Sequence, residues 1–258
     1  MILAIDIGNT HMVLGCLDQN NHVQARFIMS TSRIETSDEY AAELRQVLSL
    51  RGITPDQFEG AIISSVVPAV TAAIQKAFRL LSGKDPLVLG KDMRIPLELE
   101  MNGLPASAIA GDLLATAIAA NAYYTVPAAI IDIGTATTIT VLNEKAAYTG
   151  GCIMPGPGTA MKGLVECTAL LPAIDFLAPS DAIAKDTISA MQSGIMFGSA
   201  GALDGILDRF ADELGTPFRT VLVTGGMATI IAPLCRHEVT VDQDLLLRGL
   251  GLIWAANL

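Results

Sequence analysis

Two segments, one in each half of the chain, combine a carboxylate, a glycine and small polar residues in the same order. Ile5–Thr10 reads Ile-Asp-Ile-Gly-Asn-Thr, and Ile131–Thr138 reads Ile-Asp-Ile-Gly-Thr-Ala-Thr-Thr. Each Asp ends an apolar strand signal, and each turn that follows contains a glycine. Glycine lets the backbone approach a phosphate closely, and the exposed amide groups of such a turn form a concavity that binds anions. The pattern therefore predicts two phosphate-binding hairpins.

Hydroxyl groups and carboxylates extend this prediction. The hydroxyls of Thr10, Thr135 and Thr137 supply further donors, and a strand-end Asp can bind Mg²⁺ directly or through water. A later segment, Val223–Gly226, closes a buried strand with a glycine pair, as a nucleoside-binding turn would. The candidate nucleotide ligands are Asp6, Gly8, Asn9, Thr10, Gly134, Thr135, Thr137, Gly225 and Gly226, and the candidate metal ligands are Asp6 and Asp132.

Each motif taken alone also fits a simpler structure, a tight β-hairpin with Asp in an ordinary turn position. Two matching copies and the glycine pair favour the phosphate-binding interpretation. Neither GxxxxGK[ST] nor GxGxxG occurs in the chain. P-loop and Rossmann nucleotide sites are therefore not indicated.

Asp112 stands at the expected start of a helix in the middle of the chain. In phosphoryl transfer, a carboxylate beside the attacking hydroxyl orients it and accepts its proton, so Asp112 is the candidate catalytic residue. The alternative is an ordinary helix-start Asp, which the helix dipole favours. Thr187 carries a similar ambiguity, because threonine is also a good N-cap residue.

Four glycines, Gly194, Gly198, Gly201 and Gly205, follow one another at helical spacing, which puts them on one face of a helix. Each interior glycine costs about 0.5–1 kcal/mol relative to alanine, so the close approach of another helix is the expected compensation. The spacing leaves open whether that helix belongs to the same chain or to a second subunit.

The elements that must position these residues fall into two similar halves. The first half reads as three strands, a helix capped by Thr36 with Glu39, a buried strand over Ala61–Ser64, and a helix opened by Pro68. A short strand is expected near Leu87.

A central helix over about Ser107–Tyr124 precedes the second half. There the strand signals are Ala128–Asp132, Thr137–Leu142, a short third strand at Ala147 and Tyr148, and Val221–Thr224. This repetition predicts an α/β fold of two duplicated lobes, residues 1–115 and 116–258, each a mixed sheet with flanking helices.

Composition excludes several classes of protein. The 258 residues are 51% hydrophobic, which excludes disorder, and no apolar run reaches the ~18 residues of a membrane span. The net charge of −10 argues against a nucleic-acid partner. The first strand signal contains Asp6 and does not resemble a signal peptide. Four cysteines without a CxxC pair indicate free thiols, so we expect a soluble cytoplasmic protein.

Taken together, these motifs resemble the superfamily of acetate and sugar kinases, heat-shock cognate proteins and actin. Over almost the whole chain they look like type III pantothenate kinases. The segments that carry the narrower resemblance are Asp6–Thr10, Ile63–Pro68, Asp132–Thr138, Gly150–Gly156, Thr168–Pro172, Lys185–Thr187, Gln192–Gly194, Thr224–Gly226 and Leu245–Leu250. The resemblance implies two actin-like (ribonuclease H-like) lobes, ATP, Mg²⁺ near Asp6 and Asp132, often a monovalent cation (K⁺ or NH₄⁺), and a homodimer.

The resemblance also implies phosphorylation of the primary hydroxyl of pantothenate, the first step towards coenzyme A. It makes Asp112 the base and Gly111, Asp112 and Thr187 acceptor-binding residues, with Thr187 reaching across the dimer. One motif departs from the family: its Gly-Ala-Asp-Arg is Ala110–Leu113 here, so Leu113 replaces the arginine that holds the carboxylate of pantothenate. The alternative is an ATP-binding family member with a different acceptor or with a regulatory role and no catalysis.

Overall fold

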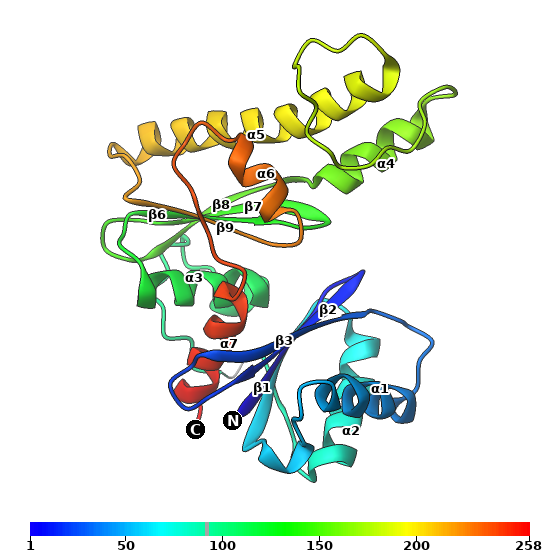
Figure 1. Ribbon diagram of the computed structural model, residues 1–258. Helices are drawn as coiled ribbons and strands as arrows, with labels where there is room; N and C mark the ends of the chain where they lie inside the picture. Colours follow the sequence, from blue (N-terminus) through cyan, green and yellow to red (C-terminus); the bar gives the residue numbers. More distant parts are fainter. Residues whose placement is uncertain (91–92) are drawn as a thin grey trace. The chain divides into compact units, whose positions relative to one another are not determined.

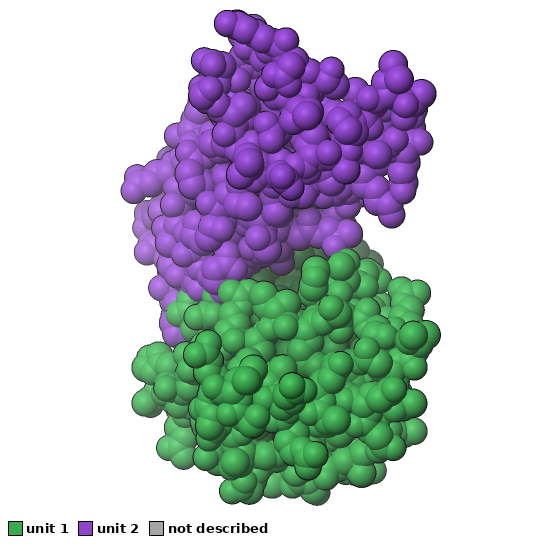
Figure 2. Space-filling view, turned by 45° about the vertical axis from the view of Figure 1, so that its right-hand side comes forward, with its two compact units in different colours: residues 1–97, 102–119, 244–258 green, residues 98–101, 120–243 purple. Residues whose placement is uncertain are grey.

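The computed structural model describes residues 1–90 and 93–258 and contains two compact units (Figure 1). Unit 1 comprises residues 1–97, 102–119 and 244–258, and unit 2 comprises residues 98–101 and 120–243 (Figure 2). Each unit is built on one five-stranded sheet with helices packed against it.

The sheet of unit 1 has the strand order β3-β2-β1-β4-β5. The central strand β1 pairs antiparallel with β2 and parallel with β4, so the sheet is mixed. Its strands are β1 (Ile2–Ile7), β2 (His11–Leu17), β3 (Val23–Ser30), β4 (Gly60–Ser65) and β5 (Leu87–Val88). Its helices are α1 (Ser37–Ser49), η1 (Pro55–Gln57), α2 (Pro68–Ser82), η2 (Ala106–Ala108), the first part of α3 (Gly111–Tyr123), and α7 (Leu245–Ala256).

The side chains of β1 alternate between the two faces of the sheet, and each face packs against a different pair of helices. Leu3, Ile5 and Ile7 are buried in a core with side chains of α1 and α2, including Tyr40 and Phe78. The alternate residues Ile2 and Ala4 pack in a second core with side chains of α3 and α7. Because successive side chains of a strand alternate between faces, Asp6 shares the face of Ile2 and Ala4.

The sheet of unit 2 has the order β10-β9-β6-β7-β8, which is the order of unit 1 read from the other edge. Its strands are β6 (Ala128–Ile133), β7 (Ala136–Leu142), β8 (Tyr148–Pro155), β9 (Thr220–Thr224) and β10 (Thr240–Val241). Its helices are α4 (Pro157–Cys167), α5 (Thr187–Leu214), α6 (Ala228–Ile231) and η3 (Ala232–Leu234), together with the last part of α3.

The two sheets match in detail. β1 and β6 share one pattern of buried and half-buried positions, and β2 and β7 share another. Both outer antiparallel pairs shift register at the same place, between Cys16 and Leu17 in unit 1 and between Val141 and Leu142 in unit 2. The predicted duplication into mixed sheets with flanking helices is confirmed.

Helix starts also follow the expectations from the sequence. Thr36 Oγ1 accepts a hydrogen bond from the Glu39 amide at 3.3 Å, and the Glu39 carboxylate accepts one from the Thr36 amide at 2.7 Å. α2 begins at Pro68 and ends before Gly83, which has φ 71°. The N-cap of α5 is Asp186 and not Thr187, because the Asp186 carboxylate accepts a hydrogen bond from the Ser189 amide at 3.0 Å.

The third strand of unit 2 is longer than predicted. β8 continues from Tyr148 to Pro155 through the pair Gly150 and Gly151. A Cβ on Gly151 would lie 1.8 Å from the carbonyl oxygen of Ile139, so this glycine lets β8 pack directly against β7. Gly151 serves close strand packing, and the expectation of a short third strand at Ala147 and Tyr148 was wrong.

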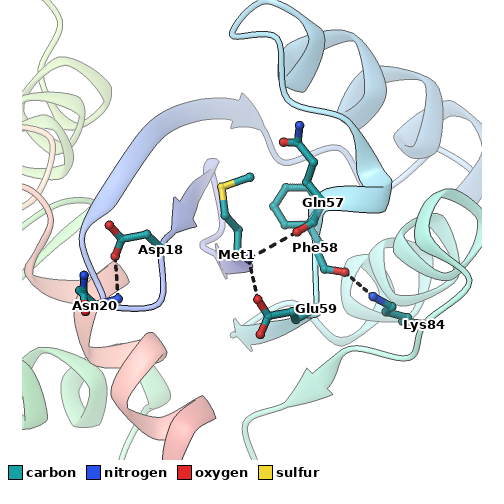
Figure 3. A network of polar contacts seen from close by, with 7 residues as sticks. All are labelled: Met1, Asp18, Asn20, Gln57, Phe58, Glu59 and Lys84. Carbon is teal, nitrogen blue, oxygen red and sulfur yellow. Dashed lines mark hydrogen bonds and ion pairs between the residues drawn. The ribbon is translucent and has the colours of Figure 1, made fainter.

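Polar contacts within unit 1 fix the start of β1 (Figure 3). The ammonium group of Met1 donates to Glu59 Oε1 at 2.9 Å and to the Gln57 carbonyl at 3.4 Å. The Lys84 side chain donates to the carbonyl of Phe58, whose ring is buried in the core. These contacts hold the beginning of β1 beside the beginning of β4.

Helix α7 belongs to unit 1, although the boundary expected from the sequence places it in the second lobe. Its side chains Leu247, Leu250 and Ile253 are buried in the core that contains Ile2 and Ala4. These apolar contacts place α7 in unit 1, although the residues that precede it in the sequence belong to unit 2. No described helix is long and apolar enough to cross a membrane.

Candidate functional site

The two strand-end carboxylates occupy equivalent positions in their sheets. Asp6 lies opposite Ser64 in the parallel pair of β1 and β4, and Asp132 lies opposite Thr224 in the parallel pair of β6 and β9. Both carboxylates are half-buried, and both hydroxyl residues are buried. Each unit therefore sets a carboxylate beside a hydroxyl at the carboxyl end of two parallel strands.

Ser64 was not among the site residues predicted from the sequence. The available signal was that a hydroxyl residue ends the later buried strand signal in each half of the chain. This residue is Ser64 in the strand over Ala61–Ser64 and Thr224 in the strand over Val221–Thr224. Only the register of the parallel strands puts these residues beside the aspartates.

The turn of the first hairpin exposes Asn9 and Thr10. The Gly8 amide donates to the His11 carbonyl at 3.0 Å and closes the turn. Thr31, just after β3, donates its amide to the Thr10 carbonyl at 2.9 Å and its hydroxyl to the Gly8 carbonyl at 2.8 Å. The turn is thus held from outside by the end of the neighbouring strand.

The second turn is one residue shorter. The Gly134 amide donates to the Ala136 carbonyl at 3.0 Å. The Thr135 carbonyl accepts from the Gly156 amide at 3.1 Å and from the Thr159 hydroxyl at 2.6 Å. A Cβ on Gly156 would lie 2.0 Å from the Gly134 carbonyl oxygen, so the start of α4 packs directly on this turn.

The shorter turn changes which threonine accompanies Asp132. Thr138 lies directly opposite Asp132, whereas Thr137 lies opposite Ile133. Ile133 is buried in the core with α5, and Thr137 is buried on that same face. The structure therefore does not bring the Thr137 side chain together with Asp132.

The glycine pair after β9 packs against Asp132. Gly225 has φ 94°, and a Cβ there would lie 2.3 Å from Asp132 Oδ1 and 2.6 Å from the Ile133 carbonyl oxygen. The Gln243 side chain donates to the Gly225 carbonyl at 3.1 Å. A built Cβ on Gly226 meets no atom within 4 Å. Unit 2 thus brings Asp132, the Gly134 turn and the glycine pair together, as expected.

Asp112 lies in the first turn of α3, beside the end of β4. A Cβ on Gly111 would lie 3.0 Å from Ser64 Oγ and 2.6 Å from Leu89 Cδ2, so the helix starts in contact with the residue that pairs with Asp6. Asp112 Oδ1 accepts a hydrogen bond from the Leu113 amide at 2.8 Å. Within residues 1–90 and 93–258, no protein donor reaches Oδ2, so a helix-start role leaves one oxygen available for chemistry.

Thr187 lies elsewhere in unit 2. It is exposed at the start of α5 and lines a mostly apolar pocket of about 790 Å³, together with Met154, Gly194 and Gly198. Ile133 and Thr137 also line this pocket, so it lies on the α5 face of the sheet, opposite to Asp132. Within one chain, Thr187 is not brought together with Asp132.

The sequence of the chain matches one known protein family. The family model described as type III pantothenate kinase matches residues 2–209. The chain belongs to the type III pantothenate kinase family. A type III pantothenate kinase of Brevibacillus brevis is 37% identical over 259 residues, covering 100% of this chain and 99% of that protein. One of Rhodospirillum centenum is 38% identical over 261 residues, covering 100% and 99%.

Solved structures of low identity share the fold. Component A of (R)-2-hydroxyglutaryl-CoA dehydratase from Acidaminococcus fermentans superposes with a TM-score of 0.58 at 16% identity, covering 99% of this chain and 96% of that chain. The ethanolamine utilization protein EutJ of Carboxydothermus hydrogenoformans gives a TM-score of 0.53 at 16% identity, covering 97% and 88%. The duplicated actin-like fold expected from the sequence is confirmed.

The thiols of this type III pantothenate kinase family member are free and differ in environment. Cys16 is buried and Cys167 is exposed, while Cys152 and Cys235 are half-buried. Burial raises the pKa of Cys16 to about 12 and that of Cys235 to about 11. These two thiols are therefore protonated and unreactive near neutral pH. Among the described residues, no group of three or more His, Cys, Asp or Glu side chains is arranged to hold a metal ion.

Proposed function

We propose that this protein transfers the γ-phosphoryl group of ATP to the primary hydroxyl of pantothenate, the first step towards coenzyme A. Family membership over the whole chain supports this reaction. The single observation that carries the proposal is the start of α3, where Asp112 follows a glycine packed on Ser64, the residue that lies opposite Asp6 in the pair of β1 and β4. A carboxylate with an available oxygen there suits the deprotonation of an attacking hydroxyl.

The nucleotide ligands that we propose lie at the two turns and the glycine pair. They are Asp6, Gly8, Asn9, Thr10, Gly134, Thr135, Thr137, Gly225 and Gly226; of these, Thr137 has its side chain on the α5 face of the sheet. Gly111, Asp112 and Thr187 are the proposed acceptor ligands, and Asp112 is the proposed catalytic base.

Asp6 and Asp132 are the proposed ligands of Mg²⁺. Gly225 packs directly on Asp132, so that the backbone after β9 lies beside this carboxylate, where a Cβ would collide with it. Mg²⁺ typically takes one or two protein carboxylates and completes its shell with phosphates and water, so a cluster of three protein ligands is not required. When bound, it neutralises phosphate charge. We also propose a monovalent cation, K⁺ or NH₄⁺, on family resemblance alone.

A homodimer is the second part of the proposal. A Cβ built on Gly194, Gly198, Gly201 or Gly205 meets no neighbouring atom within 4 Å, so among residues 1–90 and 93–258 no other helix packs closely on that face. Large apolar side chains of β8, α4, α5 and the segment between the helices are exposed, namely Ile153, Leu164, Leu170, Leu177, Ile183 and Ile188. A second copy covering this region would remove them from water and would explain the glycines. It would also make the exposed Thr187 available to a partner subunit.

The test of the proposed function is turnover of Mg-ATP by the purified protein, with and without pantothenate. We expect ADP and phosphopantothenate in equal amounts only when pantothenate is present. We expect Asp6→Asn and Asp132→Asn to lower metal-dependent turnover while both proteins remain folded. ADP formation that does not respond to pantothenate would instead support a family member with a different acceptor. Free thiols without disulfides suit a reducing compartment, so we propose that the reaction occurs in the cytoplasm.

A further inference from the structure

A polar segment just after β3 is fixed on two sides in unit 1. Thr31 makes two hydrogen bonds to the turn of the first hairpin, to the carbonyls of Thr10 and Gly8. The next residue, Ser32, is held by Tyr40 of α1: the Tyr40 hydroxyl accepts from the Ser32 amide at 3.0 Å and donates to the Ser32 carbonyl at 2.6 Å. Tyr40 is fully buried, so it is a rigid support.

The residue presented by this segment is Arg33. Its side chain is exposed, and its Nη2 donates to Asn9 Oδ1 at 3.4 Å. That distance is longer than the usual 2.7–3.2 Å of an N–H···O hydrogen bond, so the contact is weak. A guanidinium binds a phosphate far better than a neutral amide, because it can donate two charge-assisted hydrogen bonds at once.

The equivalent position in unit 2 carries no charge. There the Gly156 amide binds the carbonyl of Thr135, as the Thr31 amide binds that of Thr10. The residue two positions later is Gly158, in the first turn of α4. Of the lysines and arginines among the described residues, Arg33 is the one whose side chain makes a hydrogen bond to one of the two turns. In a chain of net charge −10, one fixed cation at a phosphate-binding turn has a large effect.

We propose that Arg33 binds a phosphate group of the nucleotide at the Gly8–Thr10 turn, and that Tyr40 is a positioning residue that acts through Ser32. On nucleotide binding, the guanidinium exchanges the amide oxygen of Asn9 for phosphate oxygens. This inference deepens the proposed function, because it rests on the nucleotide lying at the first turn.

The test is the affinity for Mg-ATP, measured by titration calorimetry on the whole protein in the absence of pantothenate. We expect Arg33→Ala to raise the dissociation constant about 10- to 150-fold, the usual effect of losing a hydrogen bond to a charged group. Arg33→Lys keeps the positive charge but cannot donate two parallel hydrogen bonds as a guanidinium does. Its affinity for Mg-ATP should therefore lie between those of the parent and Arg33→Ala. Arg51→Ala, a change of an exposed arginine just after α1, is the matched control and should bind as the parent does.

A double-mutant cycle tests the role of Tyr40. Tyr40→Phe keeps the ring in the core and removes both hydrogen bonds to Ser32. It should weaken Mg-ATP binding in the parent and have little further effect in Arg33→Ala, because coupled residues are not additive. An equal loss in both backgrounds would overturn the positioning role.

Two outcomes separate this inference from the proposed function. Parent-like Mg-ATP affinity in a folded Arg33→Ala protein overturns the role of Arg33 and leaves the kinase proposal standing. A weakened Arg33→Ala protein whose parent never phosphorylates pantothenate supports Arg33 and overturns the proposed acceptor. A parent that binds no Mg-ATP overturns both.

Discussion

At the scale of single residues, strand register determines which side chains can act together. Asp6 and Asp132 were predictable from sequence, because a carboxylate that ends an apolar run is visible in the pattern. The hydroxyl of Thr137, predicted as a further donor to phosphate, lies on the face of the sheet opposite to Asp132. The second turn is one residue shorter than the first, and a shift of one residue moves a side chain to the opposite face of a sheet. Gly156 packs directly on this shorter turn, a contact with the residue that follows β8, which the local sequence does not reveal.

Asp112 allows a direct test of the chemical step. Asp112→Asn should lower the rate of phosphoryl transfer about 10²- to 10⁴-fold, the usual contribution of a general base, with little change in the KM for ATP. Steady-state kinetics with varied ATP would measure both the turnover rate and the KM for ATP. The matched control is Asp38→Asn, since Asp38 is an exposed carboxylate in the first turn of α1. Similar rates in the two variants would reduce Asp112 to a helix-start residue.

Leu113 should weaken the binding of the acceptor carboxylate. Leucine offers no hydrogen-bond donor, so we expect a high KM for pantothenate in the parent. Leu113→Arg should lower that KM about 10- to 150-fold, the value of a regained hydrogen bond to a charged group. Leu113→Met, which adds no charge, should change it little.

The neutral analogue of pantothenate, with an alcohol in place of the carboxylate, separates charge from shape. Its KM should not respond to Leu113→Arg. A parent enzyme that saturates at micromolar pantothenate and gains nothing from arginine would mean that another residue holds the carboxylate.

At the scale of elements, local signals predicted starts and ends well. The capping box at Thr36, the proline at the start of α2 and the periodicity of β1 and β6 all act within a few residues, so they are visible in sequence. The length of β8 was underestimated because the effect of Gly151 is non-local. A glycine pair breaks an isolated strand, but Gly151 here permits contact with the backbone of β7. The sequence alone does not show whether a glycine in a strand breaks it or lets a neighbouring strand approach closely.

The glycine pair after β9 offers a matched comparison within one turn. Gly225→Ala should destabilise the protein by more than about 1 kcal/mol, because its φ is 94° and the new Cβ would collide with Asp132. It should also weaken Mg-ATP binding by displacing that carboxylate. Gly226→Ala, with no atom within 4 Å of the new Cβ, should melt close to the parent. Thermal unfolding of the two variants measures the difference, and equal melting temperatures would contradict the close packing.

At the scale of the whole molecule, the repeated motifs predicted two similar units, and the matching sheet orders confirm them. The assignment of α7 was not predictable. Its contacts join Leu247 and Leu250 to Ile2 and Leu17, more than 200 positions away, and no local signal encodes such a contact.

The glycine face of α5 tests the proposed dimer. Gly198→Leu should give a monomer in multi-angle light scattering, because the larger side chain would hold a second copy away. Within one chain this substitution meets open space, so the monomer should stay folded. Ala42→Leu, at an exposed position of α1, is the control and should leave the parent's mass unchanged. A Gly198→Leu dimer as stable as the parent would contradict the interface.

The return of α7 to unit 1 bears on the order in which the ribosome releases foldable parts. Residues 98–101 and 120–243, which make up all of unit 2, emerge before α7, whereas unit 1 still lacks that helix at this point. We therefore expect the part translated second to become protease-resistant first. Nascent chains stalled after residue 243 has left the exit tunnel should show a resistant unit 2 and a digestible unit 1. The interval before α7 appears is when the apolar face of Ile2, Ala4 and Ile62 is open to chaperones.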